Sequence, residues 1–163
     1  MHAAFKGWAG AGLLQSAIHY QERAGPMKLL PIRLRPQQDL REALASVLSE
    51  HGVSAAFVLS GIGSLSETRI RYAGVGEAAL LRGDLEILTL SGSIAPDGVH
   101  LHMTVSDARG TVIGGHVAPG CTIRTTAEIL LALLPDYRFS REPDPQSGWD
   151  ELVVRRITPP GAA

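Results

Sequence analysis

Three histidines with strand-like spacing are the residues of this chain best suited to chemistry. His100 and His102 alternate with apolar residues, and His116 follows after an Asp-Ala-Arg-Gly stretch at 107–110. Because neighbouring side chains of a β-strand point to opposite faces, His100 and His102 are predicted to share one face. Histidine is the commonest metal ligand in proteins, so the position of His116 relative to this pair decides what the three can do.

The turn between the two predicted strands sets that position. A three-residue loop at 108–110, with Gly110 in the left-handed conformation, is a common hairpin connection. It places His102 opposite His116, keeps the apolar side chains on one face and gathers the three imidazoles on the other. A four-residue loop would move His116 to the apolar face, so the histidine cluster depends on this register.

Three imidazoles within a few ångströms suit a divalent transition metal, zinc first, with one position left for water or another ligand. The sequence therefore predicts a metal site at His100, His102 and His116. The alternative is a polar sheet face with solvated or hydrogen-bonded histidines, and the spacing alone leaves both open. A metal that activates water would make the protein a metal-dependent enzyme. Its general base, or a carboxylate that orients a histidine, would be Glu86 on a neighbouring predicted strand.

The elements that must position these residues follow from hydrophobic periodicity. Residues 40–51 carry an apolar stripe at helical spacing, with Asp39 as the N-cap and Gly52 after the last turn. Residues 122–134 repeat apolar side chains at helical spacing, so a second helix is expected there. Predicted strands cover 30–35, 53–59, 68–72, 85–94, 99–106, 111–117, 137–141 and 152–154. The expected fold class is α+β, with a mixed, largely antiparallel β-sheet and two helices in a single compact domain.

Composition excludes several classes of protein. The chain has 163 residues, of which 45% are hydrophobic and 19% are charged, and its formal net charge is −1. These values are typical of one globular domain and argue against a strongly basic nucleic-acid-binding protein. No apolar run is long enough to span a bilayer, so no membrane partner is expected.

The single cysteine, Cys121, excludes an intramolecular disulfide and fits a reducing compartment, so a cytoplasmic location is predicted. Cys121 precedes the predicted second helix. A thiol at a helix N-terminus can have a lowered pKa, which would make Cys121 reactive. The alternative is that Cys121 is a small buried side chain that only fills space in the core. The sequence favours the buried side chain.

Three segments are predicted along the chain. Residues 1–26 mix small residues, glycines and isolated charges without a clear period, and they are expected to form a flexible N-terminal extension before a plausible start at Met27. Residues 27–157 form the predicted domain, and residues 158–163 form a C-terminal tail. A short amphipathic helix around residues 13–18 is the alternative for the first segment.

Glycines and arginines form further patterns. The stretch 61–63 lacks the third glycine of a dinucleotide-binding loop and precedes a predicted strand, so nucleotide binding is not expected. Gly114 and Gly115 permit close backbone approach, which leaves room for a metal-bound ligand or a neighbouring subunit. Paired arginines favour a solvated surface with ion pairs at this net charge, with phosphate contact as the alternative. The pairs lie at 33 and 35, 69 and 71, and 155 and 156.

Several stretches, taken in order, resemble the PPC (plant and prokaryote conserved) domain, the AT-hook-associated domain in its stand-alone prokaryotic form. The resemblance runs from about Met27 to Ile157 and is carried by residues 61–65, 85–94, 100–102, 114–120, 139–144 and 147–152. It implies a compact α+β fold that assembles as a homotrimer. Prokaryotic members with three histidines resemble metal-binding proteins, and that pattern falls here on His100, His102 and His116.

The resemblance also implies a class of partner. Members of the family are commonly described as DNA-binding or regulatory proteins. This chain carries no Arg-Gly-Arg-Pro-like element of the AT-hook kind, so both DNA and DNA-bound proteins stay open as partners, beside other copies of the chain.

Overall fold

The computed structural model describes residues 27–157, in which eight strands and one helix follow each other along the chain. The predictions for residues 1–26 and 158–163 lie outside this described part. The elements are β1 (Lys28–Leu34), α1 (Leu40–His51), β2 (Ala56–Arg71), β3 (Ala79–Ala95), β4 (Gly98–Ser106), β5 (Val112–Val117), β6 (Thr122–Leu133), β7 (Tyr137–Pro143) and β8 (Asp150–Arg156).

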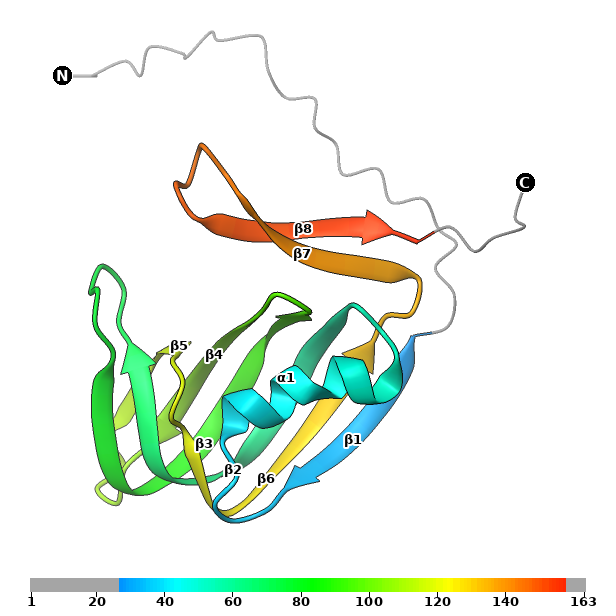
Figure 1. Cartoon of the computed structure of the whole chain (residues 1–163). Coiled ribbons are helices and arrows are strands. Elements are labelled where there is room, and N and C mark those ends of the chain that lie inside the picture. Colours follow the sequence, from blue (N-terminus) through cyan, green and yellow to red (C-terminus); the bar gives the residue numbers. More distant parts are fainter. Residues whose placement is uncertain (1–26, 158–163) are drawn as a thin grey trace, which may run out of the picture.

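Six strands form one antiparallel sheet in the order β1-β6-β2-β3-β4-β5. The last residues of β2 also pair with β5, so the strands from β2 to β5 curve round until the two meet. α1 lies across one face of the sheet, and the hairpin of β7 and β8 stands at one end of it (Figure 1). The core lies between the helix and the sheet, and the helix contributes Leu40, Leu44, Val47 and Leu48 to it.

The predicted first helix is confirmed at both ends. Asp39 Oδ1 accepts hydrogen bonds from the backbone N–H groups of Arg41, at 2.8 Å, and Glu42, at 2.9 Å. These bonds satisfy two of the donors that the first turn of a helix leaves free. The helix ends at Gly52, whose φ of 62° is left-handed. Local side-chain chemistry therefore fixes the position of α1.

The predicted second helix is wrong, because residues 122–133 form the strand β6 between β1 and β2. Its first half is rich in β-branched residues, which favour strands over helices. The apolar residues Ala127, Ile129 and Leu131 are also buried at a period of two, and the helical stripe concealed this pattern. The fold is therefore mostly antiparallel β with one helix in the described residues, which corrects the expected two-helix class.

Two strands that were predicted separately, 53–59 and 68–72, join into the single strand β2. The glycine-containing stretch between them stays paired, and it shifts the register against β6 between Gly63 and Leu65 instead of ending the strand. Such a bulge lets a long strand bend without losing its partners. In the described part of the chain, no helix has the length and apolar character that crossing a bilayer requires.

Candidate metal centre

The hairpin of β4 and β5 has the predicted register. His102 pairs with His116, Met103 with Gly115, and Val105 with Ile113. The turn is held by Asp107, whose Oδ1 accepts from the N–H groups of Arg109 and Thr111, both at 2.9 Å. Gly110 has a φ of 79°, the left-handed conformation that the three-residue loop needs.

This register brings the three histidines together on one face. One ring nitrogen from each of His100, His102 and His116 lies within 4.8 Å of the other two. The ring centroids are 5.1 Å apart for His100 and His102, 5.1 Å for His100 and His116, and 5.7 Å for His102 and His116. His102 is exposed and the other two are half-buried, so the cluster lies at the surface with one open side.

Two observations fit a metal ion. The Nε2 atoms of His100 and His102 are 3.2 Å apart. Two nitrogens bound to one tetrahedral zinc at about 2.0–2.1 Å are separated by about 3.3–3.4 Å. The same spacing also suits a hydrogen bond between a protonated and an unprotonated Nε2. The Nδ1 atom of His116 is buried and has no hydrogen-bond partner within the described residues. An unpartnered buried polar atom costs about 1–3 kcal/mol, and a cation bound at Nδ1 would give that atom the partner it lacks.

The surroundings of the cluster keep two of the imidazoles neutral. Burial, together with the positive charges nearby, lowers the pKa of His116 to about 4. Burial and the Arg141 guanidinium lower the pKa of His100. A neutral imidazole offers a ring nitrogen lone pair, which is the form that binds a metal. At pH 7 neither ring has to lose a proton before it can bind a cation.

Several charged groups near the histidines were not predicted from the sequence. Arg71 lies opposite His116 in the register of β2 and β5. Arg141, from β7, donates from Nη2 to Ser93 Oγ at 2.7 Å, and Ser93 lies opposite His100. The acidic residue whose charge acts on His100 is Glu151 of β8. These groups come from strands distant in sequence, so only the topology shows that they are neighbours.

The structure does not place Glu86 at the cluster. Glu86 is exposed and lies opposite Ser106, four residues beyond His102 along β4. At about 3.3 Å per residue, this puts it roughly 13 Å from the histidine register. The candidate base or orienting carboxylate taken from the sequence is therefore not supported by the geometry.

Cys121 and the paired glycines have structural roles. Cys121 is fully buried, precedes a strand and not a helix, and has a pKa raised by burial. A Cβ on Gly115 would lie 2.7 Å from the carbonyl oxygen of Arg71, and one on Gly114 would lie 2.8 Å from Thr104 Cγ2. The two glycines let β5 pack closely against β2 and β4, so their small size is needed within one chain.

The arginine pairs do not form one basic surface. Arg33 lies on β1 and Arg35 just after it, while the other pairs lie on β2 and β8; these three strands do not pair with one another. Arg33 donates to Thr126 Oγ1 at 3.1 Å, and Arg155 donates from Nη2 to Glu142 Oε2 at 2.9 Å. The reading as surface ion pairs is confirmed for Arg155. Arg71 differs from the rest because it lies beside the histidines.

The sequence matches one domain family and proteins that contain a similar segment. The sequence model of the Plants and Prokaryotes Conserved (PCC) domain matches residues 21–135. A protein from a Synechococcus strain, bifunctional protein GlmU, is 53% identical over 133 residues, which are 82% of this chain and 21% of that protein. AT-hook motif nuclear-localized protein 21 of Arabidopsis thaliana is 34% identical over 92 residues, 53% of this chain and 32% of that protein. The chain thus spans only a fifth to a third of these relatives.

Solved structures show the same fold over most of their length. A hypothetical protein from Salmonella has a TM-score of 0.79 and 37% identity, covering 83% of this chain and 99% of that one. A metal-containing protein from Archaeoglobus fulgidus has a TM-score of 0.67 and 28% identity, covering 80% of this chain and 95% of that one.

Proposed function

The chain belongs to the Plants and Prokaryotes Conserved (PCC) domain family, the PPC domain of the sequence resemblance, and we propose that it acts there as a regulatory binding protein with a metal centre at His100, His102 and His116. The observation that carries this proposal is the convergence of three ring nitrogens within 4.8 Å on a register fixed by one turn. The metal-containing relative from Archaeoglobus fulgidus supports it independently.

The donor set favours zinc or a similar divalent transition metal. The ligand cluster contains three histidines and no carboxylate or thiolate among the described residues. Imidazole nitrogens suit zinc, copper, iron and nickel, whereas oxygen-rich sites suit magnesium and calcium. Three protein ligands would leave one position for water or an added ligand. His102, the most exposed of the three, faces the solvent side of such a site.

A metal-dependent enzyme is the second candidate function. A bound divalent metal would supply Lewis acidity and lower the pKa of a coordinated water. Glu86 does not serve as its base, and Glu151 is the acidic residue whose charge reaches the cluster at His100. This alternative therefore rests on Glu151, while the binding role needs no base.

Metal analysis of the purified protein tests the proposal. We expect about one zinc ion per chain after expression with zinc, and a loss of most of it in His102→Ala because two imidazoles bind weakly. The matched control is His51→Ala, which removes an exposed histidine at the end of α1 and should leave the metal content unchanged. Equal metal contents in wild type, His102→Ala and His51→Ala would refute the site.

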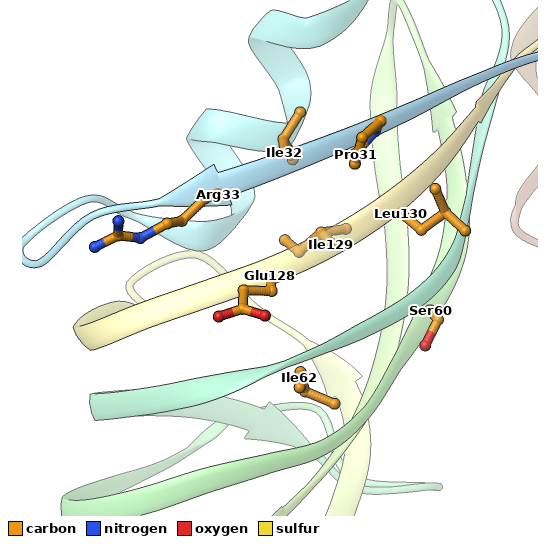
Figure 2. A pocket seen from close by; sticks show the side chains of 8 residues that line it. All are labelled: Pro31, Ile32, Arg33, Ser60, Ile62, Glu128, Ile129 and Leu130. Carbon is orange, nitrogen blue, oxygen red and sulfur yellow. The ribbon is translucent and has the colours of Figure 1, made fainter.

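We further propose that the chain assembles as a homotrimer, the assembly that the family resemblance implies. The supporting surface crosses β1, β6 and β2, where a hollow of about 560 Å³ lies between Pro31, Ile32, Ile62 and Leu130, among others (Figure 2). Ile62 is 54% exposed and Leu59 is 48% exposed on the same strand. Arg33, Ser60 and Glu128 also line the hollow. A sheet face that exposes several apolar side chains beside a few charged ones is typical of an interface between subunits.

The partner class that we propose is DNA or DNA-bound proteins. The location that we propose is the cytoplasm, a reducing compartment in which a single unpaired cysteine is stable. The relative that carries an AT-hook motif supports a DNA-associated role. Since the arginine pairs lie at three separate places in the fold, contact through a DNA-bound partner fits the surface better than a broad basic face of the chain itself.

A further inference from the structure

A hollow lined in part by polar side chains opens directly beside the histidine cluster. Its volume is about 490 Å³, and His102 and His116 form part of its wall. The rest of the lining comes from the end of β2, from β3 and from the facing parts of β4 and β5. A metal held by His102 and His116 would therefore border a space large enough for a small ligand.

Hydroxyl groups line this hollow. Tyr72, Thr89, Ser91 and Thr104 each contribute one. Thr89 and Thr104 are hydrogen-bonded to each other through their hydroxyl oxygens at 2.7 Å, while Ser91 lies opposite His102. Hydroxyls both donate and accept, so such a wall suits a ligand that carries several oxygens.

The charge of the hollow is positive. Arg71 is the one lining residue that carries a permanent charge, and no carboxylate lines it. Among the described residues, no carboxylate lies within ion-pair distance of the half-buried Arg71, whereas four other arginines, Arg82, Arg109, Arg124 and Arg155, each have one. A half-buried guanidinium without a counter-ion favours an anion that brings its own oxygens. Three neutral imidazoles would also leave the full charge of a bound divalent metal uncompensated, and this charge too would attract an anion.

We propose that this hollow binds a small oxyanion, a carboxylate or a phosphate, between the metal position and the Arg71 guanidinium. The proposal rests on the proposed metal centre and names the chemical class of its ligand. One oxygen of the ligand takes the position that three histidines leave open, the guanidinium pairs with the others, and the hydroxyls of Ser91 and Thr104 orient the remainder. Arg71 is thus a ligand-binding residue and not part of a DNA-facing patch.

The test uses Co²⁺-loaded protein, because the visible spectrum of bound cobalt reports a change of its fourth ligand. Inorganic phosphate and glycolate, a small hydroxylated carboxylate, are titrated separately. We expect a saturable spectral change with at least one of them, and the active probe identifies the oxyanion. Arg71→Gln should weaken that binding about ten- to a hundredfold, as the loss of a charged hydrogen-bonding partner does. Arg71→Lys keeps the positive charge but not the planar guanidinium, so its affinity for the anion should lie between those of the wild type and Arg71→Gln.

The matched control is Arg69→Gln, an exposed arginine two residues earlier on the same strand and outside the lining. It should bind the anion as the wild type does. Cobalt content, measured first on every variant, separates the two proposals. A protein that takes up no cobalt refutes the metal centre and this inference with it. A cobalt-loaded protein with no saturable anion binding, or with equal binding in Arg71→Gln and Arg69→Gln, overturns the inference alone.

Discussion

Among the histidines of the described residues, His116 has the most strongly lowered pKa. Burial is the largest cause of its lowered pKa, and His100 and Arg71 add to it. Its buried Nδ1 has no hydrogen-bond partner in the described part of the chain. In the metal-free protein this residue is therefore costly to protonate, and the cost should be visible as a pH dependence of stability.

The direction of that dependence follows from linkage. The pKa of His116 is about 4 in the folded chain, against an ordinary value of about 6.5 when unfolded. Between these values the unfolded chain binds a proton that the folded chain excludes, so the free energy of unfolding falls as the pH falls from 6.5 to 4. Above pH 6.5 this contribution is fully present.

Urea unfolding of the metal-free protein at pH 7.5 and pH 5 checks this expectation. The wild type should lose stability on acidification, and His116→Gln should lose less because the depressed group is gone. His51→Gln, at an exposed position, should behave as the wild type does. An acid-induced loss in His116→Gln as large as in the wild type would show that His116 is not the cause.

The sequence predicted the histidine cluster because the spacing of its residues and the turn between them are local. The register needed only Asp107, Gly110 and the alternation of apolar side chains around His100 and His102. Arg71, Arg141 and Glu151 were missed because each comes from a different strand. The pairing of β2 with β5 that brings Arg71 to His116 involves two residue pairs and leaves no periodic signal.

At the scale of elements, the spacing between β3 and β4 depends on Gly92. A Cβ at this position would lie 2.8 Å from Leu101 Cα and would also collide with the carbonyl oxygen of His100. Its φ of 149° is a conformation that other residues rarely adopt. Gly92 thus lets the two strands meet where β4 carries His100 and His102.

Gly92→Ala should therefore lower the free energy of unfolding and disturb the proposed metal centre. The backbone conformation alone costs about 1–3 kcal/mol for a residue with a Cβ, and the collision adds to it. We expect a lower urea midpoint and a reduced metal content. Gly98→Ala in the same hairpin, where the nearest atom to the new Cβ is 3.9 Å away, should change neither by much. Equal midpoints for the two variants would contradict this account of the strand spacing.

Elements were predicted well where the signal was local. The bounds of α1 followed from the cap at Asp39 and the stop at Gly52. Residues 122–133 became a strand because they lie between β1 and β2, where both edges are hydrogen-bonded. A run of consecutive apolar residues such as Ile129–Leu130–Leu131 fits both the helical spacing and the alternation of a strand. Pairing with the neighbouring strands decides between the two.

In the whole molecule, the apolar surface over β1, β6 and β2 is the feature that association between subunits would explain (Figure 2). α1 covers one face of the sheet (Figure 1), while Leu59 and Ile62 remain exposed. β1 is also an edge strand with one unpaired side. Association between copies would remove apolar area and an open edge together.

Ile62→Glu should therefore weaken self-association, since it places a charge in the apolar surface. The wild type is expected to sediment at three times the 17.3 kDa mass of the chain, and the variant at a lower mass. Val75→Glu, in the loop between β2 and β3 and 46% exposed, is the control and should keep the wild-type mass. A monomeric wild type, or an unchanged mass for Ile62→Glu, would count against this interface.

Anomalous diffraction from a crystal of the zinc-loaded protein, recorded on both sides of the zinc absorption edge, tests the metal centre without any intermediate step. We expect one peak for each chain, at about 2.0–2.1 Å from a ring nitrogen of each of His100, His102 and His116. A zinc-loaded crystal with no peak among these three imidazoles, or with its peak on other residues, would refute the metal centre.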